Sequence, residues 1–461
     1  MELNKIHSIY FIGIGGIGMS ALARWFNANG YKVAGYDRTQ TTLTTELEQE
    51  GMNVHYEDNV KLIAPEFFED DALVIYTPAV PKDHSELNYF INKGSVVKKR
   101  SEVLGMITEK MFTVAVSGTH GKTTTSSMIA HILRSAGKDC SAFLGGITQN
   151  YNTNLLLNKE KNAEGIVVVE ADEYDRSFLK LHPDVAVITS MDPDHLDIYK
   201  DAEDFKKTFN MFAAQVEANG SLIFQGELTL DPPKKSQQYI SFGTKSSLYR
   251  AEKIRVENAE FVFDIVSADE KVENIRMQVP GHHNIQNALA AFIAGRKVGV
   301  SADDIKKALH SFKGVKRRFE YHVKTKEIIY IDDYAHHPTE LNAFINAVKT
   351  LYPSKTLTLI FQPHLYSRTR DFMEGFAESL SQVDQLVLMD IYPARELPIK
   401  GITSEALLAQ VKSKSKMLAS KENLLEKIQD VNTDIIATVG AGDIDIFIEP
   451  IKQMLLNKKY V

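Results

Sequence analysis

Residues 114–127 read VAVSGTHGKTTTSS and form the most informative stretch of this 461-residue chain. An apolar strand is predicted to end at Val116, and a glycine turn then brings Lys122 and Thr123 to the start of a helix. Backbone N–H groups of such a turn point at an anion, while the lysine meets the β- and γ-phosphates and the hydroxyl ligates Mg²⁺. The pattern predicts an ATP site made of Gly118, Thr119, His120, Gly121, Lys122, Thr123 and Thr124.

A strict phosphate-loop pattern, G-x-x-x-x-G-K-[ST], would miss this segment because Val116 stands at its first glycine. The alternative interpretation is a Gly-Lys-Thr turn that only caps an ordinary helix. The residues after the turn favour nucleotide binding, because their apolar members form one helical stripe and Gly137 ends it. The stripe consists of Met128, Ile129, Ile132, Leu133 and Ala136.

Acidic residues follow the next two expected strands. The strand at 166–169 is followed by Glu170, and the strand at 185–189 by Asp192, Asp194, His195 and Asp197. Because the carboxyl ends of parallel strands meet at the ligand-binding edge of a sheet, Glu170 and Thr123 can offer the oxygen ligands that Mg²⁺ prefers. On pattern alone, His195 is more often a polar loop residue. A solvated acidic turn equally explains Asp172, Glu173 and Asp175.

The segment GIGGIG at 13–18 matches the dinucleotide-binding pattern G-x-G-x-x-G, and Asp37 ends the next expected strand. The pattern places a pyrophosphate over a helix N-terminus, and UDP-sugars and dinucleotides present the same group there. An NAD-dependent dehydrogenase and glycines used only for packing are the alternatives. An ATP loop accompanies this segment and no hydride-transfer constellation does, which favours a UDP-linked substrate activated by ATP. Its candidate contacts are Gly15, Gly16, Ile17, Gly18, Met19 and Asp37.

The composition is typical of a globular protein with several cores, since 44% of the residues are hydrophobic and 25% are charged. A net charge of −7 argues against a chain whose main task is to bind nucleic acid or anionic lipid. Cys140 is the only cysteine, which excludes an intramolecular disulfide. The sequence shows neither a signal peptide nor a run of about 20 apolar residues, so we expect a cytoplasmic protein without a membrane anchor.

Three cycles of alternating strands and helices predict an α/β protein whose parallel sheets are covered on both faces. The first cycle includes the glycine loop at 13–18, the second includes the phosphate loop, and the third follows the segment GVKRRFE at 314–320. Between 221 and 279, short strands separated by polar turns predict antiparallel pairing instead. The expected domains are residues 1–107, 108–316 and 317–461.

Nine segments in order along the chain resemble the Mur ligase family, and within it the alanine-adding branch. They are GIGGIGMSALA, SGTHGKTTT, EADE, DPDHLD, GHHNIQNALAA, RRFE, DDYAHHPTE, QPHLYSRTRDF and TVGAGDI. The resemblance implies a Rossmann-like N-terminal domain, a central P-loop-type ATPase domain with a mixed sheet plus a small antiparallel sheet, and a Rossmann-like C-terminal domain that closes over the amino acid.

The resemblance also implies an activity. It is an ATP-dependent amide-bond ligase that joins L-alanine to the carboxylate of UDP-N-acetylmuramic acid through an acyl phosphate, in peptidoglycan precursor synthesis. The implied cofactors are ATP and Mg²⁺, and the implied partners are UDP-N-acetylmuramate and L-alanine, without nucleic acid or membrane. A monomer or a homodimer is expected.

Roles in ATP and metal binding follow from the same resemblance. Lys122 is expected to hold the β- and γ-phosphates, and Thr123, Glu170 and His195 are expected to hold the metal. The implied ATP contacts outside the phosphate loop are Asn284, Asn287, Arg318 and Asp333. On pattern alone the two asparagines are a helix cap and a polar surface neighbour, and Arg318 forms a solvated basic pair with Arg317. The catalytic residues that the resemblance implies are Lys122, Glu170, His195, Arg318 and Asp333.

Tyr334, His336 and Arg368 match the region that positions the incoming alanine and the acyl group. His336 is a candidate base for the amine proton, and loss of that proton to water is the alternative. On pattern alone, the segment around Arg368 would be a charged helix start. The chain departs from its relatives here, because Ala335 stands where a glycine often follows the tyrosine. Leu365 stands where many relatives have an arginine, which puts substrate anchoring at that position in doubt.

Several sister ligases carry a carbamylated lysine that bridges two metals. The matching position in this chain falls near Phe209 or Asn210, so neither Lys206 nor Lys207 is given that role, and the alanine-adding branch manages without it. Besides the dehydrogenase, two further alternatives to an alanine ligase remain. One is a recycling ligase that attaches a ready-made peptide and usually has bulkier residues in the first glycine loop. The other is a non-catalytic nucleotide-binding scaffold, which the intact lysine, threonine and glutamate set opposes.

Overall fold

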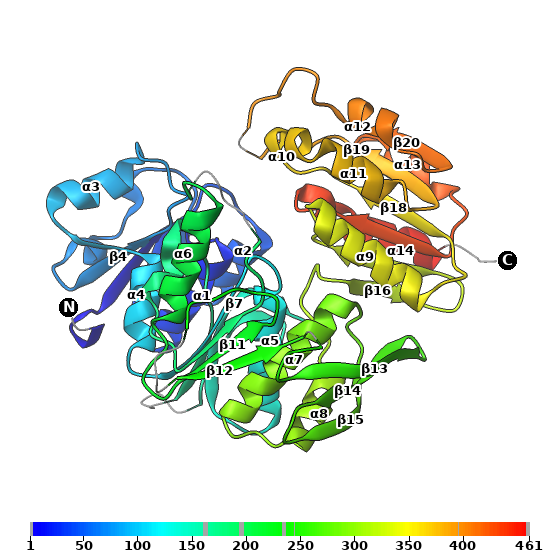
Figure 1. Ribbon diagram of the computed structural model, residues 1–461. Coiled ribbons are helices and arrows are strands. Elements are labelled where there is room, and N and C mark those ends of the chain that lie inside the picture. Colours follow the sequence, from blue (N-terminus) through cyan, green and yellow to red (C-terminus); the bar gives the residue numbers. More distant parts are fainter. Residues whose placement is uncertain are drawn as a thin grey trace. The chain divides into compact units, whose positions relative to one another are not determined.

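The computed structural model describes residues 3–159, 165–192, 198–232, 237–243, 245–394 and 396–457. The chain forms two compact units, each built from sheets and the helices packed on them (Figure 1). The larger unit comprises Met1–Lys253, Phe263–Ile275 and Ile285–Phe312. The smaller unit comprises Ile254–Val262, Arg276–Asn284 and Lys313–Val461.

The first sheet has five parallel strands in the order β3-β2-β1-β4-β5. Its central strand β1 (Ser8–Ile12) is buried throughout, because Phe11 packs in the core that includes α1 (Ile17–Ala28) and Tyr10 packs in a second core. The strand order reverses between β1 and β4, and the glycine loop follows β1 at this switch point. The other elements are η1 (Leu3–Lys5), β2 (Lys32–Tyr36), α2 (Thr42–Gln49), β3 (Asn53–His55), η2 (Val60–Leu62), η3 (Pro65–Phe68), β4 (Ala72–Tyr76), α3 (Ser85–Lys93), β5 (Val96–Lys99) and α4 (Arg100–Thr108).

The second sheet has seven strands in the order β12-β11-β10-β6-β9-β7-β8. All neighbours are parallel except the edge strand β8, which runs antiparallel to β7. Strand β6 (Phe112–Ser117) lies between β9 and β10, so the carboxyl ends of all three strands meet at one edge. The other strands are β7 (Cys140–Thr148), β8 (Thr153–Leu156), β9 (Ile166–Glu170), β10 (Val185–Ile188), β11 (Ser221–Gln225) and β12 (Gln238–Phe242).

Helices pack on this sheet through stripes of apolar side chains. The predicted stripe on α5 (Lys122–Ser135) is confirmed, because Met128, Ile129, Ile132 and Leu133 are buried, while Ala136 caps the helix end. Gly137 follows with φ 74°, the left-handed conformation that ends a helix. The other helices of the region are η4 (Tyr174–Lys180), α6 (Ala202–Ala213), α7 (His282–Lys297) and α8 (Ala302–Ser311).

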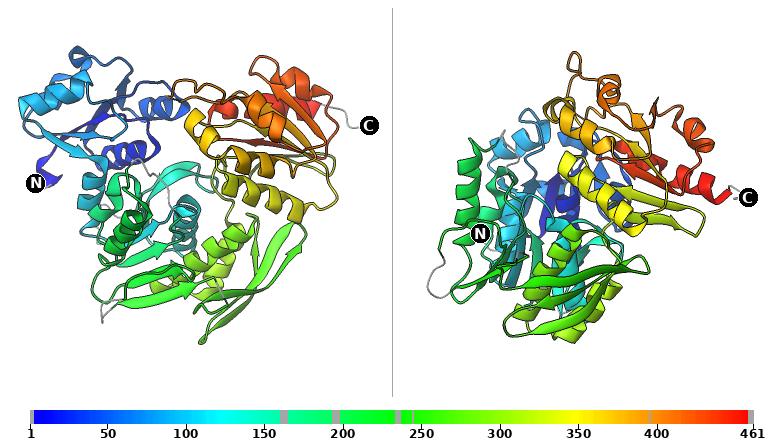
Figure 2. Two further views of the ribbon diagram at one scale, coloured as in Figure 1. Left: turned by 45° about the horizontal axis from the view of Figure 1, so that its top comes forward. Right: turned by 45° about the vertical axis from the view of Figure 1, so that its right-hand side comes forward.

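The antiparallel prediction for residues 221–279 is wrong for its first half. Strands β11 and β12 join the second sheet in parallel, and α6 is the helix that returns the chain across the sheet between β10 and β11. Only β13 (Arg250–Glu257), β14 (Glu260–Val266) and β15 (Lys271–Met277) form a separate small sheet, drawn in light green in Figure 2. A two-residue turn with positive φ at Asn258 and Ala259 joins β13 to β14, and such a short connection requires antiparallel strands.

The third sheet lies in the smaller unit, with strand order β16-β17-β21-β18-β19-β20. Only β16 is antiparallel to its neighbour. Its strands are β16 (Glu320–Lys324), β17 (Ile329–Asp333), β18 (Leu357–Phe361), β19 (Gln385–Met389), β20 (Ser415–Ala419) and β21 (Ile435–Val439). Its helices are α9 (Pro338–Leu351), α10 (Tyr366–Asp371), α11 (Met373–Leu380), α12 (Ser404–Gln410), α13 (Leu424–Gln429), η5 (Asp443–Phe447) and α14 (Ile448–Asn457). The predicted α/β class with three sheet-forming regions is therefore confirmed.

The single cysteine, Cys140, opens β7 and is fully buried as a free thiol. Burial raises the pKa of the Cys140 thiol to about 11, so the reactive thiolate is scarce near neutral pH. In the described ranges, helices fall short of the length and apolar character that spanning a bilayer demands.

Candidate active site

The predicted phosphate loop has the expected strand, turn and helix. Gly118 has φ 133° and Gly121 has φ 85°, and α5 begins directly at Lys122. A Cβ at Gly118 would lie 2.2 Å from Thr189 Oγ1, and one at Gly121 would lie 2.6 Å from Asn287 Oδ1. Both positions therefore need glycine for its backbone freedom and for close approach. The loop leaves backbone N–H groups at a helix N-terminus, which is a cradle for phosphate.

Lys122 is largely buried beside this loop and is held by three acceptors. Its Nζ donates to Gly118 O at 2.7 Å, to Glu173 Oε1 at 2.9 Å and to Thr119 O at 3.4 Å. Burial on its own would lower the pKa of Lys122, but the carboxylates of Glu173 and Glu170 raise it above its ordinary value. The side chain is therefore a buried cation at the start of the helix.

Glu170 ends β9 as predicted and reaches the same region. Its Oε2 accepts the Gly145 N–H at 3.0 Å. Burial raises the pKa of Glu170, while the charge of Lys122 and a hydrogen bond from the Thr123 hydroxyl oppose the rise. A carboxylate beside a hydroxyl oxygen is a donor set that suits Mg²⁺, so the residues present fit the predicted metal.

The loop after β10 also contacts the phosphate loop. Thr119 Oγ1 donates to the Asp192 carbonyl oxygen at 2.7 Å, and the His120 N–H donates to Ser190 Oγ at 2.8 Å. The predicted metal ligand His195 lies outside the described residues, as do Asp194 and Asp197.

The acidic turn at 172–175 is not simply solvated. Glu173 has only 1% of its side chain exposed and pairs with Lys122, which corrects the solvated-turn interpretation for this residue. Asp175 pairs with Lys99 at 2.6 Å, and Asp172 Oδ2 lies 3.6 Å from Arg100 Nη2. Sequence reasoning missed the role of Glu173, since a buried partner for Lys122 is visible only after the chain has folded.

The first glycine loop is braced by a side chain from the next strand end. Asp37 Oδ2 accepts the Gly15 N–H at 2.7 Å, and a Cβ at Gly15 would lie 2.9 Å from the same oxygen. Gly13 has φ 87°, and α1 starts at Ile17. In this structure Asp37 thus shapes the loop that was predicted to hold a UDP-linked substrate.

A cavity of about 260 Å³ joins this glycine loop to the second sheet. Its walls include Gly16–Met19 on one side and Gly145, Glu170 and Asp172 on the other. Arg100, the first residue of α4, also lines it, and a Cβ at Gly18 would lie 2.9 Å from Arg100 Nη1. Arg100 was not predicted, because the only signal was a short basic run at 98–100. An anionic group in this cavity would meet a guanidinium and a helix N-terminus.

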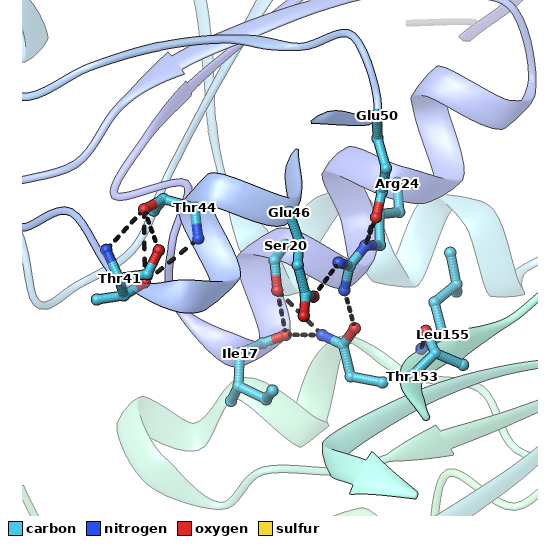
Figure 3. A network of polar contacts seen from close by, with 10 residues as sticks. Ile17, Ser20, Arg24, Thr41, Thr44, Glu46, Glu50, Thr153 and Leu155 are labelled. Atoms are coloured by element: carbon cyan, nitrogen blue, oxygen red, sulfur yellow. Dashed lines mark hydrogen bonds and ion pairs between the residues drawn. The ribbon is translucent and has the colours of Figure 1, made fainter. Parts of the chain in front are cut away.

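Polar contacts join α1, which forms one wall of the cavity, to β8, the strand that pairs with β7 of the other wall (Figure 3). Asn154 of β8 donates to Ile17 O at 2.6 Å and to Ser20 Oγ at 3.0 Å, and it accepts from Arg24 Nη1 at 2.7 Å. Arg24 also pairs with Glu46 and Glu50, each at 2.8 Å. The helix that follows the first glycine loop is therefore anchored to the edge strand of the second sheet.

The two predicted adenine-side asparagines lie at the start of α7. Both are buried, at 4% and 6% exposed for Asn284 and Asn287, so the alternative of a polar surface neighbour is wrong. Asn287 lies directly against Gly121 of the phosphate loop. Asn284 donates its side-chain N–H to Pro280 O at 2.6 Å, as a residue that supports the helix start would.

In the smaller unit, Asp333 ends β17. Its two carboxylate oxygens accept the N–H groups of Phe319 and Ala335 at 2.7 and 2.8 Å. Burial raises the pKa of Asp333 to about 6, and the charge of Arg318 opposes that rise. Arg318 lies over the ring of Tyr334, 5.3 Å from its centroid.

The neighbouring Arg317 is not part of a solvated basic pair. It forms an ion pair with buried Asp332 at 3.1 Å and donates to Gly440 O at 2.6 Å. Both guanidinium groups lie over the Tyr334 ring, Arg317 at 5.2 Å and Arg318 at 5.3 Å from its centroid, and Arg317 is also tied to the sheet through Asp332.

The predicted base His336 has a defined tautomer. Its Nδ1 lies 3.0 Å from Tyr334 O, and a carbonyl only accepts, so Nδ1 carries the proton and neutral His336 keeps a lone pair on Nε2. Burial lowers the pKa of His336, which favours this neutral form. Arg368 Nη1 lies 3.4 Å from His364 Nδ1, and Leu365 between them has φ 71°. That left-handed backbone is unusual for leucine and marks local strain.

Among the described residues, one further cluster has ligand-like side chains, namely Asp58, His84 and Glu86. Asp58 accepts the N–H groups of Ser85 and Glu86, and Glu86 accepts the Asn59 N–H and the Tyr10 hydroxyl. The Asp58 oxygens therefore stabilise the start of α3, while Glu86 links this helix to Asn59 and Tyr10, so both carboxylates already have hydrogen-bond donors.

Comparison with known proteins gives the same ligase family along the whole chain. Three family models match: "Mur ligase family, catalytic domain" over residues 8–111, "Mur ligase middle domain" over 116–295 and "Mur ligase, glutamate ligase domain" over 317–442. The chain is 53% identical to a UDP-N-acetylmuramate–L-alanine ligase of Cytophaga hutchinsonii, covering 100% of this chain and 99% of that protein. It is 50% identical to the protein of the same name from Flavobacterium johnsoniae, covering 99% of both.

Solved structures agree with this result. The UDP-N-acetylmuramate–alanine ligase of Thermotoga maritima is 28% identical and superposes with a TM-score of 0.83, covering 98% of this chain and 100% of its own. A murein peptide ligase of Psychrobacter arcticus shares the fold at 24% identity with a TM-score of 0.71, covering 99% and 100%.

Proposed function

The chain belongs to the Mur ligase family, and we propose that it joins L-alanine to the carboxylate of UDP-N-acetylmuramate at the expense of ATP. The observation that supports this most directly is the cavity that contains both Gly16–Met19 and Glu170. Glu170 also interacts electrostatically with Lys122 of the phosphate loop. A UDP-linked acid bound along the first loop would therefore place its reactive end beside the phosphates of ATP.

The first step is transfer of the γ-phosphoryl group to the muramyl carboxylate, which gives an acyl phosphate and ADP. Lys122 at the helix N-terminus would neutralise charge on the transferred group, and the amides of the glycine turn would orient it. Mg²⁺, held by Thr123, Glu170 and His195, would supply further positive charge to the phosphate oxygens. Arg100, with Asp172 beside it, is placed to bind an anionic part of the UDP-linked substrate.

The second step is attack of the L-alanine amine on the acyl phosphate, with loss of phosphate. The amine must be deprotonated, and His336, with a lone pair on Nε2, is a candidate base, with water as the alternative acceptor of the proton. Tyr334 and Arg368 would position the amino acid, and Arg318 and Asp333 would contact ATP. This assignment rests on the match of these positions to the family motifs.

The alternatives have less support. About half of the residues are identical to those of an alanine ligase over the full length, which opposes a recycling ligase. The murein peptide ligase of Psychrobacter arcticus shares only the fold with this chain. Membership of a ligase family excludes the NAD-dependent dehydrogenase that the first glycine loop alone would suggest. We place the reaction in the cytoplasm, where UDP-linked precursors and ATP occur together.

One assay tests the proposal. ADP release is measured with UDP-N-acetylmuramate and ATP while L-alanine is compared with L-serine, glycine and a tripeptide. L-alanine should give the highest kcat/KM, and Lys122→Ala should lower turnover by at least about a hundredfold while circular dichroism remains native. A preference for the tripeptide, or full activity of the variant, would reject the assignment.

A further inference from the structure

Lys122 has no spare donor in this structure. An ammonium offers three N–H donors, and Gly118 O, Thr119 O and Glu173 Oε1 accept them. A phosphate oxygen that binds Lys122 must therefore replace one of these acceptors. The two carbonyls belong to the phosphate loop itself and carry no net charge, and the bond to Thr119 O is long at 3.4 Å, so Glu173 is the one acceptor of the three that competes as an anion. Exchange of the Glu173 carboxylate for a phosphate leaves the loop unchanged.

The Glu173 carboxylate is poorly satisfied apart from its bond to Lys122. Its side chain is 1% exposed, and its Oε2 is buried without a hydrogen-bond partner among the described residues. Burying a carboxylate oxygen without partners costs free energy, and a half-satisfied buried ion pair contributes little net stability. The pair is consequently weak enough to be exchanged when a stronger anion arrives.

The neighbouring carboxylates also oppose binding of a triphosphate at Lys122. Glu170 and Asp172 also act on Lys122, so the cation already lies among three carboxylates. A triphosphate brought to Lys122 is repelled by all three. Of these, only Glu173 is hydrogen-bonded to the ammonium and has to leave it.

We propose that Glu173 is a positioning residue that competes with the triphosphate of ATP for Lys122. The carboxylate holds the ammonium at the helix N-terminus, and the γ-phosphate displaces it on binding. When the γ-phosphate has been transferred, Glu173 recaptures the lysine, which favours release of ADP. This inference rests on the proposed function, because it requires the phosphate loop to bind ATP.

The test is Glu173→Gln, which removes the competing charge and keeps the shape. Titration calorimetry with Mg²⁺ and AMP-PNP, a non-hydrolysable ATP analogue, should give a Kd about tenfold lower for the variant than for wild type. This is the change expected if Lys122 is free of Glu173 in about one wild-type molecule in ten before nucleotide binds. The gain for ADP should be smaller, because ADP lacks the γ-phosphate. Without nucleotide, the thermal midpoint of the variant should fall, because Lys122 loses its counter-ion. A residue with only a structural role would lower the midpoint and leave Kd equal or higher, and that result would overturn the proposal.

Two further variants keep the test decisive. Glu257→Gln makes the same chemical change at an exposed ion pair with Arg255 and Arg276, and it should leave the AMP-PNP affinity unchanged. Glu173→Asp draws the carboxylate back by one methylene and should tighten AMP-PNP binding by about threefold, which serves if the glutamine variant does not fold. If wild type binds no AMP-PNP, the proposed ATP reaction is wrong. If wild type binds and neither Glu173 variant binds more tightly, the role of Glu173 alone is wrong.

Discussion

Asn154 in the edge strand β8 donates a side-chain N–H to the carbonyl oxygen of Ile17, the first residue of α1, at 2.6 Å. The asparagine is fully buried and also bonds Ser20 and Arg24. One amide group therefore holds the helix of the first glycine loop against the second sheet. The relative placement of the two cavity walls depends on this junction.

Replacing this amide should weaken both the fold and the cavity. Asn154→Ala leaves the Arg24 donor without one of its acceptors in a buried position, so the free energy of unfolding should fall by about 1–3 kcal/mol. The KM for UDP-N-acetylmuramate should rise more than the KM for ATP. The reason is that α1 belongs to the wall proposed to bind the UDP-linked substrate, whereas ATP is proposed to bind at the phosphate loop. Urea denaturation and steady-state kinetics measure the two effects. Asn27→Ala, which removes a more exposed bond to Glu50 O, is the matched control and should change stability by less than about 0.5 kcal/mol.

Arg100 should matter for the UDP-linked substrate and not for ATP. Removing a charge-assisted hydrogen bond to an anion costs about 1.5–3 kcal/mol, so Arg100→Ala should raise the KM for UDP-N-acetylmuramate by about 10- to 100-fold. Arg100→Lys should recover only part of this loss, because an ammonium lacks the paired donors of a guanidinium. Arg370→Ala removes an exposed arginine and should leave KM unchanged. An equal rise in the KM for ATP would show that Arg100 acts elsewhere.

Gly145 should control the metal requirement through Glu170. A Cβ at this glycine would lie 2.3 Å from Glu170 Oε1 and 2.4 Å from Oε2, so Gly145→Ala must push the carboxylate away. The Mg²⁺ concentration for half-maximal activity should rise by at least about tenfold, since misplaced ligands bind metal poorly. The KM for L-alanine should remain the same, which distinguishes a metal effect from general damage. An unchanged Mg²⁺ requirement would remove Glu170 from the metal site.

His131 should make the fold sensitive to acid. Burial lowers the pKa of His131 to about 4, and its ring nitrogens lie 2.9 Å from Tyr151 Oη and Ser311 Oγ. A histidine whose pKa is lowered in the folded state stabilises the fold at pH values above its unfolded-state pKa of about 6.5. This contribution is lost as the pH falls toward 4. The loss should amount to about 3 kcal/mol. His131→Gln should show a smaller decrease in unfolding midpoint between pH 6.5 and 4 than wild type, whereas His310→Gln, at an exposed position, should match wild type.

Local patterns predicted the parts of the site that are local in sequence. The strand, turn and helix around Lys122 follow from glycine conformation and the apolar stripe, and the fold contains all three. The pairing of Lys122 with Glu173, and the approach of Arg100 to Gly18, join segments that are distant in sequence. No periodicity reports such contacts, so they became visible only with the tertiary structure.

The error at β11 and β12 has a similar cause. A short strand such as Ser221–Gln225 looks the same in a hairpin and in a parallel sheet. What decides the pairing is the helix before it, α6, whose buried Phe205, Phe209 and Phe212 pack on the sheet. Phe209, one of the two positions expected to match the carbamylated lysine of sister ligases, is part of the apolar core.

The lone thiol of Cys140 makes this chain convenient for spectroscopy. A fully buried sulfhydryl with a pKa of about 11 reacts very slowly with maleimides under native conditions. One cysteine introduced on the surface of each compact unit can thus carry a fluorophore or a spin label without mutation of the native residue. Distances between such labels, followed while substrates are added in turn, would report directly whether and when the two units move during catalysis.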